Sequence, residues 1–122
     1  MTGEKATWAI RLAAAAFADL DDIVDWTADR FGESQARSYA ALLNDAILAL
    51  AGGPTAPGVR ARPEIGRDLF TLHAGRGTSR ARHLILFRVR QRGDGAFIEV
   101  LRVLHDAMDL TRHVPPPAEN KR

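Results

Sequence analysis

The sequence contains no cysteine, which excludes disulfide scaffolds, zinc sites with cysteine ligands and thiol catalysis. It also has no apolar run near the roughly 18 residues that a membrane span needs. The longest apolar stretches, 12–20 and 84–87, are short or bounded by charge. Residues 1–5 do not begin a cationic segment followed by an apolar one, so we expect no secretory signal. These absences predict a cytoplasmic protein with no membrane partner.

What is present fits one small domain. The 122 residues are 46% hydrophobic and 26% charged, a length and composition that can bury a core without covalent staples. We predict a single domain over residues 1–115 and a disordered tail over 116–122, because three prolines at 115–117 end the folded pattern. The glycine-rich segment 75–80 lacks the Gly-Lys-Ser/Thr ending of a phosphate loop, and we expect no cofactor.

The net charge of +2 conceals two strongly charged segments of opposite sign. Residues 60–92 hold nine arginines against two acids, a balance of +7. Residues 17–46 hold seven acids against two arginines, a balance of −5. Such polarity favours at least one charged partner, although a solvated basic face would give the same composition.

The first half of the chain predicts one strand and two helices. Residues 8–12 alternate in hydrophobicity with period two, which indicates a strand. Apolar residues then follow helical spacing up to Gly32, and again from Glu33 to the Gly52-Gly53-Pro54 stop. A link this short predicts an antiparallel helical hairpin. Its stripes are expected to form the core: Phe17, Leu20, Val24, Tyr39, Leu43 and Ile47.

The second half predicts three strands after a loop over 55–63. The strands are expected at 69–73, 83–90 and 97–105, with Asp94-Gly95 as a hairpin turn. Asp106 is expected to cap a short helix that runs through Thr111. The whole is an α+β fold in the order β-α-α-β-β-β with a short C-terminal helix. We therefore expect an antiparallel-rich four-stranded sheet packed against the helical hairpin.

Short fragments that follow one another along residues 8–115 resemble a known family. In order they are Trp8-Ala9-Ile10, Asp19-Leu20-Asp21-Asp22-Ile23, Trp26, Phe31-Gly32, Arg62-Pro63-Glu64-Ile65-Gly66, residues 98–106, Met108-Asp109-Leu110 and Arg112-His113. Together they resemble the RelE/ParE superfamily, the toxins of bacterial type II toxin-antitoxin systems. The block from residue 98 onward is similar to the ParE branch in particular.

The resemblance implies a toxin that a ParD-like antitoxin neutralises within a hetero-oligomer. ParE-like members are associated with DNA gyrase, so we expect inhibition of gyrase by binding. Contact with the target is expected at the C-terminal segment: Arg102, His105, Asp109, Arg112 and His113. Antitoxin contacts are expected at the edge of the first helical stripe and on the basic strands: Ile23, Trp26, Arg82, Arg88 and Arg90. No segment is typical of a DNA-reading helix, so sequence-specific DNA binding is not expected.

RelE-like members cut messenger RNA on the ribosome, and this activity is the alternative. Such cleavage needs a general base, cationic stabilisers and an acid around one phosphate. The resemblance places arginines of the family at two positions that are apolar here, Phe70 and Leu84, and the only tyrosine lies on a helical stripe. The remaining candidates are Glu64, Arg62, Arg67, Arg82, His83 and His105. Nothing in their spacing requires a shared site, which favours binding over catalysis.

Two further alternatives stay open at this level. The chain could be a toxin remnant that only binds antitoxin, because toxicity is not a physical property of the sequence. His105, Asp109 and His113 stand at i, i+4 and i+8, a spacing that would place all three on one face of a continuous helix as possible metal ligands. His105 is expected to end a strand, however, and a structural zinc site normally has four ligands, so we predict no metal site.

Overall fold

The computed structural model describes residues 7–75, 81–93, 95–108 and 110–113. Its helices are α1 (Ala14–Phe31), α2 (Glu33–Ala49) and two short 3-10 helices, η1 (Leu50–Gly52) and η2 (Leu110–Arg112). Its strands are β1 (Ala9–Leu12), β2 (Val59–Ala61), β3 (Leu69–His73), β4 (His83–Arg92) and β5 (Gly95–His105). The predicted tail over 116–122 and the segment 76–80 lie outside the described residues.

The strands form a single sheet in the order β1-β5-β4-β3-β2. β1 pairs with β5 in parallel, and the other neighbours are antiparallel. The predicted α+β class and its antiparallel-rich sheet are therefore confirmed. The predicted strand count was wrong, because Val59–Ala61 pairs with β3 as a fifth strand inside the expected loop. Three residues are too few to show an alternating pattern in the sequence.

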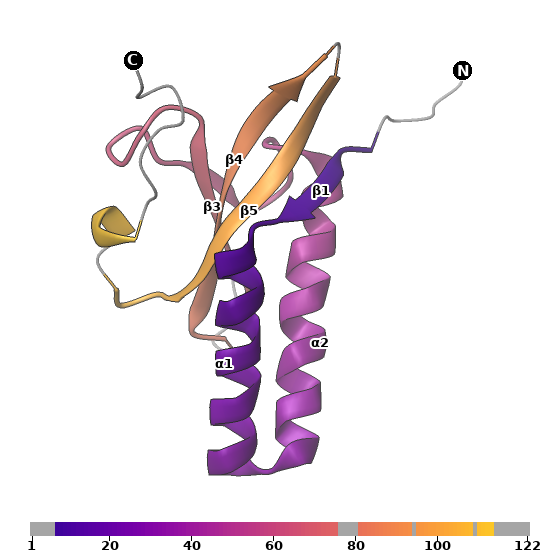
Figure 1. The fold of residues 1–122 in the computed structure, drawn as a ribbon, viewed down its shortest axis with the longest axis vertical. Coiled ribbons are helices and arrows are strands. Elements are labelled where there is room, and N and C mark those ends of the chain that lie inside the picture. Colours follow the sequence, from indigo (N-terminus) through magenta and orange to yellow (C-terminus); the bar gives the residue numbers. More distant parts are fainter. Residues whose placement is uncertain (1–6, 76–80, 94, 109, 114–122) are drawn as a thin grey trace.

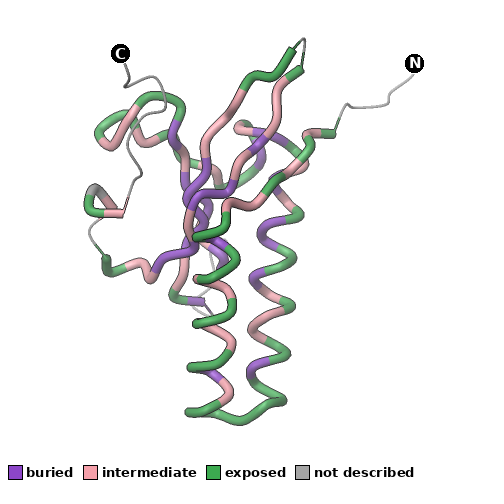
Figure 2. Tube along the Cα trace, in the orientation of Figure 1, coloured by how far each residue is buried: buried purple, intermediate pink, exposed green. Residues whose placement is uncertain are grey.

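The helical hairpin is confirmed and covers one face of the sheet (Figure 1). Gly32 ends α1 with a φ of 92°, a value that glycine adopts at little cost, and its N–H donates to the Ala28 carbonyl. The hairpin extends well past the sheet, and Figure 2 shows that this distal half is mostly exposed or half-buried. None of the described helices has the length and apolar content of a membrane span.

The main core lies between the hairpin and the sheet. From α2 it takes Leu43 and Ile47, and from the sheet it takes Ile85, Phe87 and Val100, all buried. The prediction that Phe17 belongs to this core was wrong, because its side chain is 58% exposed. Ala16 is fully buried at that turn of α1 instead, and one residue on an α-helix is a rotation of about 100°.

The opposite face of the sheet carries a smaller apolar cluster. It consists of Leu69, Leu84, Leu86, Leu101 and Leu104, with Ile65 and Leu110 packed at its edge. The two apolar positions singled out in the sequence thus lie on opposite faces. Leu84 belongs to this cluster, whereas Phe70 packs on the main core and stacks on Phe87 at 5.5 Å between ring centroids. Both are core residues in this fold.

The long β4–β5 hairpin is confirmed, but Gly95, predicted in its turn, is the first residue of β5. Gly95 pairs with Arg92, and Gly93, which follows Arg92, has a positive φ of 59°. Asp94 lies outside the described residues. Further along, Leu86 pairs with Arg102 and Phe87 with Val100, which leaves Leu101 as an extra residue on β5. Irregularities of this kind bend and twist a strand pair.

The prediction of a helix from Asp106 to Thr111 was wrong about where the helix begins. β5 ends at His105 as expected, but beyond it, within the residues described up to 113, only η2 (Leu110–Arg112) is helical. Asp106 does not cap a helix. Its carboxylate accepts a hydrogen bond from the His73 ring at 2.9 Å, and its N–H donates to the Arg82 carbonyl. Asp106, which the local sequence pattern assigned to a helix cap, is therefore held by His73 of β3.

Candidate functional site

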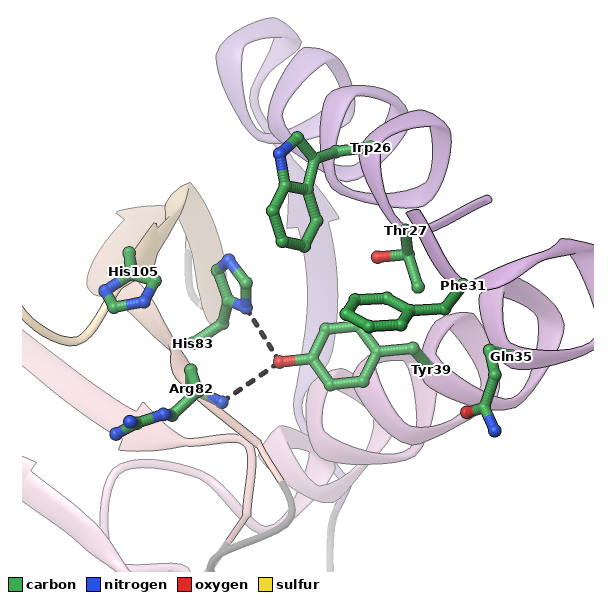
Figure 3. A pocket seen from close by; sticks show the side chains of 8 residues that line it. All are labelled: Trp26, Thr27, Phe31, Gln35, Tyr39, Arg82, His83 and His105. Carbon is green, nitrogen blue, oxygen red and sulfur yellow. Dashed lines mark hydrogen bonds between the residues drawn. The ribbon is translucent and has the colours of Figure 1, made fainter. Parts of the chain in front are cut away.

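A pocket of about 590 Å³ opens where the exposed half of the helical hairpin faces the ends of β4 and β5. Figure 3 shows that side chains from three parts of the fold line it. α1 contributes Trp26, Thr27 and Phe31, α2 contributes Gln35 and Tyr39, and the strand side contributes Arg82, His83 and His105. A concave, largely apolar space with a few polar groups at one end is the usual form of a binding site.

The helical wall of the pocket is aromatic and exposed. Trp26 is 53% exposed and Phe31 is 62% exposed, and their rings meet edge to face at 6.0 Å. The guanidinium carbon of Arg30 lies 4.9 Å from the centroid of the Trp26 ring, a cation–π arrangement. Large aromatic side chains left open to water beside a cavity are typical anchors for a protein partner.

The inner end of the pocket is a chain of hydrogen bonds centred on Tyr39. Its hydroxyl oxygen accepts a hydrogen bond from the Arg82 backbone N–H at 3.1 Å. The same hydroxyl lies 2.7 Å from Nδ1 of His83 (Figure 3). Because one N–H already points at the tyrosine oxygen, the hydroxyl proton is directed to Nδ1, and neutral His83 accepts it. These bonds tie the hairpin to the start of β4.

Burial controls the ionisation of both partners in this chain. Burial raises the pKa of the Tyr39 phenol above its ordinary value of 10.0. Burial also lowers the pKa of His83 below 6.5, and the neighbouring His105 lowers it further. Both shifts favour the uncharged forms, which agrees with a neutral hydroxyl that donates to a neutral imidazole.

Two more histidines, His105 and His73, lie beside this chain of hydrogen bonds. The His105 ring meets the His83 ring edge to face at 5.5 Å, and its Nδ1 accepts a hydrogen bond from the Ala107 N–H. His73 contacts Asp106 at 2.9 Å, and this hydrogen bond holds the pKa of Asp106 below its ordinary value. Among the described residues no three His, Asp or Glu side chains are placed to hold a metal ion. Asp109, the middle residue of the His105, Asp109 and His113 spacing for which we predicted no metal site, lies outside them.

The ribonuclease candidates fall into two separate groups. Arg82, His83 and His105 meet in the pocket. Glu64 instead contacts Arg62 at 3.5 Å, and the Arg62 N–H bonds the Leu69 carbonyl. Leu69 pairs with Arg88, five residues along β4 from His83, which is roughly 17 Å at about 3.3 Å per residue. Arg67 is exposed in the loop that carries Glu64, so these six residues do not surround one phosphate.

The residues predicted to contact a target have different environments. Arg102 forms a two-pronged ion pair with Asp19 of α1, at 2.7 and 2.8 Å, and this hydrogen bonding raises its pKa. It therefore has a structural role as well, and its contact with a target stays a prediction. His105 lines the pocket, Arg112 is exposed and His113 is half-buried.

The predicted antitoxin contacts lie on both faces of the sheet. Trp26 and Arg82 line the pocket, and Ile23 packs partly buried against the main core. Arg88 and Arg90 alternate along β4 with core residues, so they project from the opposite face, where both approach Glu99. The Arg88 Nε is buried and has no hydrogen-bond partner within the described part of the chain.

The sequence pointed to only part of this pocket. Thr27, Phe31, Gln35, Tyr39 and the neighbouring His73 were not among the predicted site residues. One signal was present, because a tyrosine on an apolar helical stripe must find a partner for its hydroxyl when it is buried. The identity of that partner, 44 residues away in the chain, depends on how the hairpin lies on the sheet.

Comparison with known proteins identifies the family. A family model described as the ParE toxin of the type II toxin-antitoxin system parDE matches residues 10–110. The chain belongs to the ParE toxin family. ParE toxin family proteins named Toxin ParE1 include one from Mycobacterium tuberculosis, 38% identical over 104 residues that cover 84% of this chain and 94% of the relative. Another, from Caulobacter vibrioides, is 33% identical over 105 residues that cover 85% and 95%.

Solved structures of similar proteins agree with the fold. The chromosomal ParDE toxin-antitoxin system from P. aeruginosa contains a chain with a TM-score of 0.62 and 21% identity, covering 83% of this chain and 98% of that one. A YoeB/ParE toxin from Agrobacterium tumefaciens gives a TM-score of 0.54 at 14% identity, with 80% and 97% covered. At these identities the likeness shows the fold alone, and it confirms the expected ParE-like architecture.

Proposed function

We propose that this protein inhibits DNA gyrase by binding to it and that a cognate antitoxin neutralises it. Membership of the ParE toxin family over residues 10–110 is the observation that carries the proposal. The C-terminal segment makes the contact with gyrase through Arg112 and His113, which follow the last strand. The antitoxin covers the pocket that Trp26 and Arg82 line, where apolar surface is exposed.

The separation of the ribonuclease candidates supports binding rather than RNA cleavage. Glu64, the carboxylate among them, is paired with Arg62 and is remote from the two pocket histidines. A metal-independent ribonuclease needs its base, acid and cationic stabilisers within reach of one phosphate. A toxin that acts by binding does not need this convergence.

A second candidate function is cleavage of messenger RNA on the ribosome. One observation favours it: Arg82, His83 and His105 line the same pocket, beside the Tyr39 hydroxyl. A neutral histidine can accept a proton and an exposed arginine can stabilise a phosphate. This group lacks a carboxylate base, because Asp106 is engaged with His73.

Induction of the toxin in cells without antitoxin separates the two functions. Gyrase inhibition is expected to give filamentation and a DNA damage response, whereas ribonuclease activity gives rapid loss of translation and cut transcripts. We expect the Arg112→Ala/His113→Ala double variant to relieve growth arrest and to keep its affinity for antitoxin. The control is Arg60→Ala/Arg92→Ala, which removes two exposed cations elsewhere and should leave toxicity unchanged.

Three outcomes of this experiment contradict the proposal in different ways. If the Arg112/His113 variant keeps full toxicity, the C-terminal segment does not make the contact with gyrase. If transcripts are cut and no DNA damage response follows, the target is messenger RNA and not gyrase. Unimpaired growth with the folded wild-type protein identifies a remnant that only binds antitoxin.

A further inference from the structure

Three arginines lie on the face of the sheet that points away from the helical hairpin, on the adjacent strands β1 and β4 that flank β5 (Figure 1). They are Arg11, Arg88 and Arg90. Their neighbours along the strands, such as Ile10 and Val89, pack against the main core. Because successive side chains of a strand point to opposite faces, the arginines project from the other face of the sheet.

The strand register gathers these arginines around one carboxylate, that of Glu99 on β5. Arg11 and Arg88 pair with Glu99 from either side, and Arg90 pairs with Phe97, two residues along β5. Glu99 Oε1 lies 3.3 Å from Arg90 Nη1 and 4.0 Å from Arg88 Nε. The guanidinium carbon of Arg11 lies 5.1 Å from the centroid of the Phe97 ring. We call Arg11, Arg88 and Arg90 the arginine site.

The charge of the arginine site is not balanced within the described residues. Both ion pairs at the site use Glu99, so three guanidinium groups and one carboxylate leave a local charge of +2. Arg88 Nε is buried and has no hydrogen-bond partner in the described part of the chain. The two outer members are open to a ligand, because Arg11 is exposed and the Arg90 side chain is 39% exposed. The site therefore has more donors than acceptors, which is the condition for binding an anion.

A phosphate backbone is the anion that suits this arrangement. The planar guanidinium group binds phosphate oxygens through two parallel hydrogen bonds. Glu99 holds Arg90 and the Phe97 ring holds Arg11, so both groups are oriented before a ligand arrives. The β4–β5 hairpin that carries the site extends beyond the other strands (Figure 1). A two-stranded β-ribbon of this kind can approach a groove of duplex DNA.

We infer that the arginine site binds backbone phosphates of duplex DNA, independently of sequence. The choice of DNA rests on the proposed function, because the DNA on which gyrase acts lies beside a toxin that is bound to gyrase. Contacts to phosphate carry no sequence information, which agrees with the lack of a segment typical of a DNA-reading helix. Arg92, one pair further along β4 and opposite Gly95, is not part of the site, because nothing in the described residues holds it to Glu99 or Phe97.

Two observations favour duplex DNA over other occupants. Single-stranded nucleic acids gain affinity by stacking bases on open aromatic rings, whereas the Phe97 ring is half-buried and has Arg11 over it. An acidic segment of the antitoxin is the competing occupant, because Arg88 and Arg90 were predicted as antitoxin contacts. The antitoxin proposed here covers the pocket instead. His83 of that pocket is five residues from Arg88 along β4, roughly 17 Å at about 3.3 Å per residue.

Fluorescence anisotropy of a labelled DNA duplex, titrated with the purified toxin at several salt concentrations, tests the inference. We expect Arg11→Ala and Arg90→Ala each to weaken binding by about fivefold or more, equally on unrelated sequences. Each should also reduce the steepness of log affinity against log salt by about one. The controls Arg37→Ala and Arg92→Ala remove the same charge from α2 and from β4 outside the site. They should stay within about twofold of the wild type.

A variant that gains affinity guards against misfolding. Glu99→Gln removes the one carboxylate at the site and keeps an acceptor oxygen for Arg90. We expect it to bind DNA about threefold more tightly or better, because a carboxylate repels the phosphate backbone. Misfolding would weaken binding instead. If folded Glu99→Gln binds DNA no better than the wild type, the inference is contradicted.

Three further outcomes would overturn the inference. If Arg92→Ala weakens DNA binding as much as Arg90→Ala does, binding follows the general charge of the hairpin and not the arginine site. If Arg11→Ala/Arg90→Ala binds DNA like the wild type but binds the antitoxin more weakly in calorimetry, an acidic antitoxin segment occupies the site. If an RNA duplex of the same sequence binds more tightly than DNA, the choice of DNA is wrong.

Failure of the inference and failure of the proposed function give different results. A wild-type toxin that inhibits gyrase supercoiling but does not bind the duplex at low salt overturns the inference and leaves the proposed function in place. A toxin that binds the duplex through Arg11 and Arg90 but leaves supercoiling unimpaired supports the arginine site and shows that gyrase inhibition is wrong.

Discussion

At the scale of single residues, Tyr39 decides the shape of the pocket. Its ring forms part of the apolar wall, and its hydroxyl joins the Arg82 backbone N–H to His83. Removing the hydroxyl would leave the inner end of the cavity with an unpaired N–H and an unpaired imidazole nitrogen. The Arg82 N–H is exposed and His83 is half-buried, so water replaces part of what these two groups lose.

Titration of Tyr39 tests this arrangement directly, because it is the only tyrosine. We expect its phenol in the folded protein to ionise above 10.0, since burial raises its pKa, whereas the urea-unfolded chain should titrate at the ordinary value. The neutral form therefore stabilises the fold below pH 10.0, and this stability is lost as pH rises through the folded pKa.

The measurement is the near-ultraviolet absorbance of tyrosinate as a function of pH. A Tyr39→Phe variant supplies the baseline, because it removes the entire tyrosinate signal. Ionisation of the folded protein at or below the pKa of the unfolded chain would mean that the hydroxyl is solvated, and the hydrogen-bond chain in the pocket would then be wrong.

At the scale of elements, one ion pair fastens the first helix to the last strand. Asp19 of α1 accepts two hydrogen bonds from the Arg102 guanidinium and a third from the Val103 N–H at 2.9 Å. The Asp19 side chain is only 13% exposed and that of Arg102 28%. The helical stripes and the β4–β5 hairpin followed from local spacing. This contact did not, because its partners are 83 residues apart in the chain.

A double-mutant cycle with Asp19→Asn and Arg102→Met should give a coupling free energy of about 2 kcal/mol, since each single change leaves a poorly solvated partner. Urea denaturation measures it. The matched control is the exposed pair Glu33–Arg37, whose side chains are 85% and 76% exposed at 3.8 Å, and its coupling should stay below about 0.5 kcal/mol. Equal coupling in the two cycles would contradict a structural role for Arg102.

At the scale of the whole molecule, the fold was largely predictable and the site only partly so. Spacing alone gave the helical hairpin and four of the five described sheet strands, because each is set by residues a few positions apart. The edge strand β2 was missed, since three residues show no period. The pocket needed the placement of the hairpin on the sheet, which brings Trp26 and Tyr39 opposite Arg82 and His83.

The charge of the whole molecule is divided between two segments of opposite sign. A net charge of +2 hides an acidic hairpin and a basic second half, and the pocket lies between them. The fold brings together only some of the six residues that were candidates for RNA cleavage. Glu64 lies beside Arg62, whereas the two histidines line the pocket. Binding of a macromolecular target, the function that we propose, needs no such convergence.

Supercoiling of relaxed plasmid by purified DNA gyrase is the sharpest test of gyrase inhibition by this protein. We expect the wild-type protein to inhibit supercoiling, its antitoxin to restore it, and Arg112→Ala/His113→Ala to inhibit only at about tenfold higher concentration or more. The control Arg60→Ala/Arg92→Ala should inhibit like the wild type. Unimpaired supercoiling at saturating toxin, together with cleavage of ribosome-bound messenger RNA by the same preparation, would show that messenger RNA and not gyrase is the target.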